Sequence, residues 1–132
     1  QDDVCCFNKS NIGVRVSGFV DIEKYSEAQL KKAVATIGPI SVAIDASLPT
    51  FIHYTGGMFD EPGCDVLNLG HAVLVVGYGR EGDQDYWLVK NRQVSIASHW
   101  GITWGEEGYI RMSRNKNNQC GIATHASYPL VR

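Results

Sequence analysis

A predicted β-hairpin in the middle of the chain constrains the fold more than any other feature. Residues 72–79 and 86–90 are mostly apolar, and the polar loop "REGDQD" separates them. Two such runs joined by a short polar loop indicate a pair of antiparallel strands. The chain must therefore build an antiparallel sheet, and residues that flank the open end of the hairpin must lie close together.

Two polar residues flank that open end. His71 stands just before the first strand, and Asn91 ends the second. The amide oxygen of Asn91 can accept a hydrogen bond from one ring nitrogen of His71, which leaves the other nitrogen as a base. This pair is two-thirds of a Cys-His-Asn arrangement, the thiol counterpart of the serine triad. The alternative is a histidine at a sheet edge with no catalytic role.

The rest of the chain predicts more strands and one main helix near 27–37. Ser26 can cap this helix, Gln29 can complete a capping box, and Gly38-Pro39 ends it. Further strands are predicted at 13–22, from Pro39 onwards, at 109–112 and at 127–131. The expected fold class is mainly β, an antiparallel sheet or barrel with one main helix. Residues 1–132 are expected to form a single domain without internal repeats.

Composition excludes several partners. The 132 residues are 44% hydrophobic and 20% charged, with a net charge of −2, which is typical of a globular domain. Scattered Lys and Arg residues without a basic stripe argue against nucleic acid. The longest apolar run, 72–76, is too short to cross a bilayer, and the first residues lack the pattern of a signal peptide. Cysteines and histidines lack zinc-site spacing, so no metal or other cofactor is expected.

The four cysteines lie at positions 5, 6, 64 and 120. Cys64 and Cys120 are free to pair, which would indicate an oxidising compartment. The alternative is four buried thiols in a cytosolic protein. The triplet Asn8-Lys9-Ser10 is a glycosylation acceptor pattern and favours the secretory route.

Long stretches of the chain resemble the C-terminal half of a papain-family cysteine protease, closest to the cathepsin L group. These are "NIGVRVSGFVDI", "LKKAVATIGPISVAIDA", "LGHAVLVVGYG", "DYWLVKN", "WGITWGEEGYIRMSRNKNNQCGIAT" and "ASYPLV". The resemblance implies that the chain is one half of an α+β two-domain protease. It also implies that His71 is the general base, Asn91 its orienting amide, Trp100 the indole that covers their contact, and Trp104 a second tryptophan beside it.

The resemblance also assigns cysteines and a substrate pocket. Cys64 and Cys120 match a disulfide pair, whereas Cys5 matches a cysteine whose partner lies in the other half and Cys6 has no counterpart. The residues that match the pocket for the substrate's second residue are Ala43, Leu69, Ala72 and His125. An imidazole at position 125 is expected to disfavour bulky apolar side chains and to tolerate acidic ones at low pH, where it can carry a charge.

Two departures from the family pattern bear on activity. The nucleophilic cysteine and the helix that carries it are not found in this chain, and neither Cys5-Cys6 nor Cys64 is a convincing substitute. In addition, eight residues at 92–99, "RQVSIASH", separate Asn91 from Trp100, where the family has one. As a surface loop this insertion costs little free energy, but it can also displace the indole from the His71–Asn91 contact.

Three interpretations follow. The first is a part of a cathepsin L-like endopeptidase, lysosomal or secreted, that acts on peptide or protein substrates. On this interpretation Cys5 or Cys6 is a candidate for a disulfide to the missing half. On this view the isolated chain is inactive. The second is an inactive relative that binds peptides or proteins, and the third is a purely structural, disulfide-stapled sheet.

Overall fold

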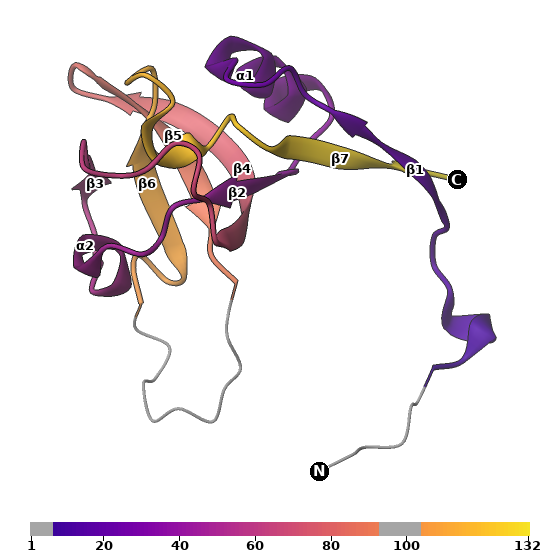
Figure 1. The fold of residues 1–132 in the computed structure, drawn as a ribbon. Helices are drawn as coiled ribbons and strands as arrows, with labels where there is room; N and C mark the ends of the chain where they lie inside the picture. The colour runs from indigo at the N-terminus through magenta and orange to yellow at the C-terminus, as the bar shows by residue number, and fades with distance from the viewer. Residues whose placement is uncertain (1–6, 93–103) are drawn as a thin grey trace.

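The computed structural model describes residues 7–92 and 104–132, and Figure 1 shows their arrangement. The elements in chain order are η1 (Lys9–Asn11), β1 (Val16–Asp21), α1 (Glu27–Thr36), β2 (Ile40–Ile44), α2 (Pro49–Ile52), β3 (Met58–Phe59), β4 (His71–Glu81), β5 (Gln84–Lys90), β6 (Tyr109–Ser113), η2 (Gln119–Gly121) and β7 (Ala126–Val131). The prediction of a mainly β fold with one main helix is confirmed. The predicted hairpin is present as β4 and β5.

All strands belong to one sheet in the order β1-β7-β2-β4-β5-β6-β3. Its pairings are antiparallel except for β3 with β6, which is parallel. Strands β1 and β3 are the two edges, so the described chain forms an open sheet rather than a closed barrel. The parallel pair joins two-residue β3 to a strand far along the sequence, and no local turn pattern predicts such a contact.

Helix α1 begins and ends where its sequence indicates. The hydroxyl of Ser26 accepts a hydrogen bond from the N–H of Gln29 at 3.2 Å, and Gly38 beyond the helix adopts a φ of 125°. The capping box is only half formed, because the N–H of Ser26 donates to the carbonyl of Glu23. The helix buries Leu30, Ala33 and Val34, and these residues join the core.

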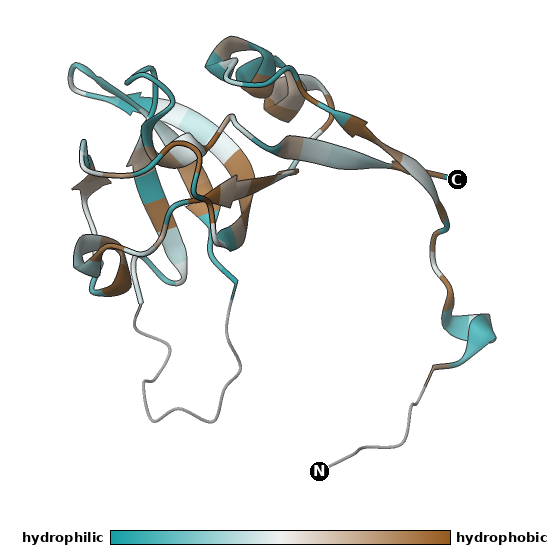
Figure 2. Ribbon diagram, viewed as in Figure 1, coloured by the Kyte–Doolittle hydropathy of each residue, from teal (hydrophilic) through white to brown (hydrophobic). Residues whose placement is uncertain are grey.

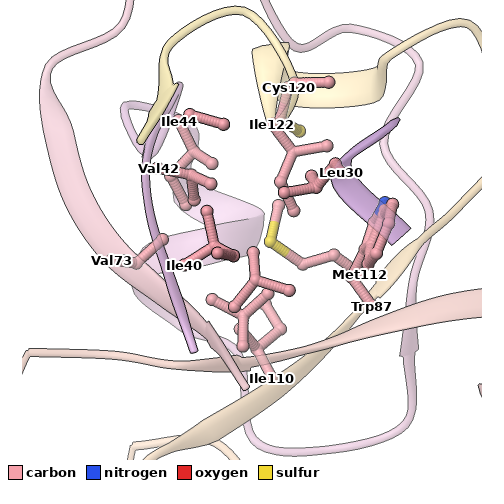
Figure 3. Packing of buried hydrophobic residues seen from close by; sticks show 14 of the residues in the cluster. Leu30, Ile40, Val42, Ile44, Val73, Trp87, Ile110, Met112, Cys120 and Ile122 are labelled. Carbon is pink, nitrogen blue, oxygen red and sulfur yellow. The ribbon is translucent and has the colours of Figure 1, made fainter. Parts of the chain in front are cut away.

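The core lies between α1, the central strands and the segment around η2. Figure 3 shows the side chain of Met112 in the middle of this cluster, close to aliphatic side chains from several elements. Trp87 of β5, Ile40 of β2 and Ile110 of β6 are fully buried. Burial of each such side chain stabilises the fold by roughly 1.5–3 kcal/mol. The core therefore fixes β2, β4, β5 and β6, the strands that carry the candidate site.

Strands β1 and β7 form a ribbon that extends away from the other strands (Figure 1). Apolar residues of this ribbon are visible in Figure 2, and four of them are exposed: Val16, Phe19, Leu130 and Val131. Phe19 is 70% exposed. Nothing within residues 7–92 and 104–132 covers these side chains, and apolar surface of this kind favours contact with another polypeptide.

Candidate active site

The hairpin brings His71 and Asn91 into contact. His71 is the first residue of β4 and pairs with Ile44 of β2, while Asn91 directly follows the last residue of β5. The N–H of Asn91 donates to the carbonyl of Gly108 at 3.0 Å, which holds its backbone. The Nε2 atom of His71 lies 2.7 Å from Oδ1 of Asn91, and both residues are half-buried.

A β-bulge in β4 places the side chains of His71 and Asn91 on the same face of the sheet. Gly77 pairs with Leu88 but Val75 pairs with Val89, so Val76 is an additional residue in β4. Leu74 pairs with Lys90, so the next pair in this register is Val73 with Asn91. Val73 and His71 point to the same face, and Asn91 therefore does so too. Without the bulge Asn91 would stand opposite Leu74, and His71 would point to the other face, because a shift of one residue exchanges the faces of a strand.

The contact fixes the protonation pattern of the neutral imidazole. An amide oxygen only accepts hydrogen bonds, so Nε2 of His71 carries the hydrogen. The Nδ1 atom then has a free lone pair and can act as a base. Among the described residues, none donates a hydrogen bond to Nδ1. The arrangement can therefore take a proton from a group placed on the Nδ1 side of the ring.

Aromatic side chains from α2 and its surroundings pack beside this pair. The ring of Phe51 meets the ring of His71 edge-on, with centroids 5.9 Å apart. Trp104 stacks obliquely on Phe51 at 5.0 Å and donates its indole N–H to the Phe51 carbonyl at 2.9 Å. Trp104 is thus anchored on α2, and Phe51 lies between it and the histidine. Phe51 is not among the predicted site residues, because nothing in its local sequence indicates a contact with His71.

The predicted indole cover and most of the insertion cannot be compared with this geometry. Trp100 lies outside the described residues, as do the insertion residues 93–99, and of the insertion only the exposed Arg92 is described. The role of Trp100 over the His71–Asn91 contact remains a prediction.

Three of the four predicted pocket residues lie next to one another in sequence register: two on neighbouring strands and His125 just before β7. Ala43 of β2 pairs with Ala72 of β4, and its N–H donates to the carbonyl of His125 at 3.3 Å. His125 and Ala72 are exposed and Ala43 is half-buried. Neighbouring residues in a strand point to opposite faces, so the side chains of His71 and Ala72 at the start of β4 lie on opposite faces of the sheet.

Leu69, the fourth predicted pocket residue, lies over the loop that contains Cys120. A Cβ atom added to Gly121 would lie 2.5 Å from Cδ2 of Leu69, and Gly121 has a φ of 70°. Only glycine allows this close approach without strain. The loop that leads into His71 is thereby packed closely onto η2.

A disulfide joins Cys64 to Cys120 and ties the same two segments together. Asp45 reinforces the junction: its N–H donates to the carbonyl of Cys120 at 3.0 Å, and its carboxylate accepts from the N–H of Asp65 at 2.8 Å. Burial acts to raise the pKa of Asp45, but hydrogen bonds from Ser47 and Asp65 outweigh it, so the pKa is lowered. Both cysteines are oxidised, so neither offers a thiol to His71, while Cys5 and Cys6 lie outside the described residues.

Other site types find no support in the described part of the chain. There, no group of three or more His, Cys, Asp or Glu side chains is arranged to hold a metal ion. None of the helices there has the length and apolar character needed to span a membrane.

Comparison with known proteins defines the class. The chain matches the papain family of cysteine proteases over residues 1–130, and it belongs to that family. Within the family it is cathepsin L-like. It is 60% identical over 131 residues to cathepsin L of Sarcophaga peregrina, covering 98% of this chain and 37% of that protein. It is 54% identical over 131 residues to cathepsin L1 of Drosophila melanogaster, covering 98% of this chain and 33% of that protein.

A solved structure agrees with the fold. The structure of digestive procathepsin L 3 from the larval midgut of Tenebrio molitor is similar, with a TM-score of 0.84 and 45% sequence identity. The match covers 98% of this chain and 40% of that chain. The chain therefore spans about two-fifths of the relatives' length or less, and the predicted resemblance is confirmed for that part.

Proposed function

We propose that this chain supplies the general base and its orienting amide to a cathepsin L-like cysteine endopeptidase, and that the nucleophilic thiol comes from the remainder of the protein. The observation that carries the proposal is the 2.7 Å contact between His71 Nε2 and Asn91 Oδ1. It supports the role because it leaves Nδ1 as the basic nitrogen of a ring that packs against Phe51.

The proposed reaction begins with transfer of the thiol proton to Nδ1 of His71. The thiolate attacks the carbonyl carbon of an extended peptide, and the imidazolium returns the proton to the leaving amine. Asn91 keeps the ring in the productive orientation throughout and stabilises the imidazolium through its amide oxygen. Water then hydrolyses the acyl-enzyme. No metal or cofactor enters these steps.

Peptide or protein chains are the proposed substrates, and Ala43, Leu69, Ala72, Trp100, Trp104 and His125 are proposed to contact them. The proposed location is lysosomal or secreted, and the Cys64–Cys120 disulfide supports passage through an oxidising compartment. A covalent link between the remainder of the protein and Cys5 or Cys6 is part of the proposal.

One observation favours a second candidate function. Exposed apolar residues on the β1–β7 ribbon, among them Phe19 and Val16, could serve an inactive, peptide-binding or protein-binding relative. The two candidates differ in whether the His71–Asn91 contact is used.

Substitution of His71 tests the choice. In the full-length protein, His71→Ala is expected to reduce hydrolysis of a fluorogenic peptide by about 10³-fold or more. His53→Ala is the matched control, because His53 is an exposed histidine at the end of α2. It is expected to keep wild-type activity. No hydrolysis by the wild type or by either variant, with folding verified by circular dichroism, would favour the binding module, whereas full activity of His71→Ala would contradict the role of His71 as the base.

A further inference from the structure

A short segment ahead of β1 has the geometry of a modification site. Asn8 precedes η1, and its Oδ1 accepts two hydrogen bonds from Ser10, one from the N–H at 3.0 Å and one from the hydroxyl at 2.8 Å. Asn8, Lys9 and Ser10 are all exposed. In Figure 1 the segment lies beyond the start of β1, at the end of the ribbon that extends away from the core.

We propose that Asn8 carries an N-linked glycan. The triplet Asn8-Lys9-Ser10 satisfies the acceptor requirement of a hydroxyl residue two positions after Asn, with no proline between them. The hydroxyl of Ser10 is already directed at the amide oxygen of Asn8. Its hydrogen bond stabilises the charge that develops on this oxygen when the amide nitrogen gives up a proton.

The reaction balances with a lipid-linked oligosaccharide diphosphate as the donor. A bond forms between Nδ2 of Asn8 and the anomeric carbon of the first sugar. The bond from that carbon to the diphosphate oxygen breaks, the lipid diphosphate leaves, and one proton from Nδ2 passes to a base of the transferase. No oxidant or reductant takes part.

The folded chain has room for the product. Nδ2 of Asn8 donates to no residue within the described part of the chain, so a bond to sugar breaks no contact there. The adjacent Phe7 is 68% exposed, and a glycan beside it would cover apolar surface with a hydrophilic group. The proposal rests on the secretory location given above, which the Cys64–Cys120 disulfide supports.

Peptide mapping of the natural full-length protein tests the proposal. The peptide that contains Asn8 is expected only after treatment with a peptide N-glycosidase in ¹⁸O-labelled water, with Asn8 converted to labelled Asp. The same digest reports whether Cys64 and Cys120 are linked. Unmodified Asn8 in a protein with the disulfide intact overturns the glycan proposal and leaves the location standing. Unmodified Asn8 together with reduced Cys64 and Cys120 overturns both.

Variants expressed as the full-length precursor in secretory eukaryotic cells give an independent result. Asn8→Gln and Ser10→Ala are expected to lose the glycan completely, and Ser10→Thr to keep it. Asn11→Gln is the matched control, since Asn11-Ile12-Gly13 is not an acceptor triplet. The readout is the gel shift on glycosidase treatment of secreted protein. An unchanged shift in Ser10→Ala would refute the assignment to Asn8.

Discussion

At the scale of single residues, His125 is the one imidazole among the proposed substrate-contacting residues. Its neighbour Ala43 pairs in turn with Ala72, and alanine has the smallest side chain apart from glycine. An exposed imidazole next to them takes up volume and adds polarity. If these residues contact the substrate as proposed, His125 limits which side chains fit.

His125→Ala should therefore widen the preference of the full-length protease. Its kcat/KM for peptides with Leu or Phe as the second residue before the cleaved bond is expected to rise by roughly 10-fold, the usual size of a change in apolar pocket volume. A peptide library profiled for the wild type and the variant measures this. A wild-type preference for Leu or Phe that is already strong and does not change in the variant would contradict the role of His125.

The position of the His71–Asn91 pair could be predicted from the sequence, but the face that the two side chains share could not. Their place at one end of a hairpin follows from the apolar runs and the polar loop between them. Their common face depends on the bulge at Val76. Gly77 beside it is a local signal, because a glycine inside a strand often marks a bulge, but it does not show which face the two side chains share. Phe51 was missed for a related reason, since its neighbour His71 lies on a different element.

At the scale of elements, Glu27 joins the start of α1 to two other parts of the fold. Its Oε1 accepts from the indole N–H of Trp87 and from the N–H of Asn115, each at 3.0 Å, and its Oε2 accepts from the N–H of Asn118 at 3.2 Å. The carboxylate also lies in the first turn of the helix, where the dipole favours negative charge. Trp87 is fully buried, so its indole N–H depends on this partner.

Loss of this carboxylate should destabilise the protein. Glu27→Ala is expected to lower the free energy of unfolding by about 2–3 kcal/mol, because three N–H groups lose a charged acceptor. Glu27→Gln keeps one acceptor oxygen and should lose less. Glu23→Ala, at an exposed position, should change stability by less than about 0.5 kcal/mol. Urea unfolding of the full-length variants gives these values, and equal stability of Glu27→Ala and Glu23→Ala would disprove the linking role.

The lowered pKa of Asp45 makes the stability of the protein depend on pH. Its pKa in the folded chain is below the usual value of 3.8, so folding favours the ionised form. The stabilisation is therefore complete above about pH 4 and is lost as the pH falls through the lower, folded pKa. Asp45→Asn should be less stable than the wild type at about pH 6, and the difference should shrink towards about pH 2.5. Urea unfolding at both pH values tests this, with the exposed Asp83→Asn as the control; a difference that stays constant with pH would contradict it.

The elements themselves were largely predictable, and their long-range partners were not. The apolar pattern and the flanking Gly and Pro residues predicted α1, β2 and the β4–β5 hairpin, because these signals are local. The predicted strand at 13–22 is shorter in the structure, Val16–Asp21. The parallel β3–β6 pair and the bonds of Glu27 join distant segments, and a single sequence carries no local record of such pairings.

At the scale of the whole molecule, the described chain is an open sheet with an exposed apolar ribbon, and it holds only part of the proposed catalytic group. It spans about two-fifths or less of its relatives, and the described residues contain the His71–Asn91 contact but no free thiol. The exposed apolar residues of β1 and β7 are where further polypeptide is expected to pack. The proposed proteolysis therefore needs groups beyond the described residues.

The 132-residue chain produced by itself should consequently be inactive. It is expected neither to hydrolyse a fluorogenic peptide nor to react with a peptide-based active-site probe, whereas the full-length protein does both. Its exposed apolar ribbon should make it self-associate, and light scattering can measure this. In the natural protein, the mass under non-reducing conditions shows whether Cys5 or Cys6 is linked to another chain. Hydrolysis by the isolated chain that His71→Ala abolishes would mean that the nucleophile lies within these 132 residues. Because Cys64 and Cys120 are bonded to each other, such a result would direct the search to Cys5 and Cys6.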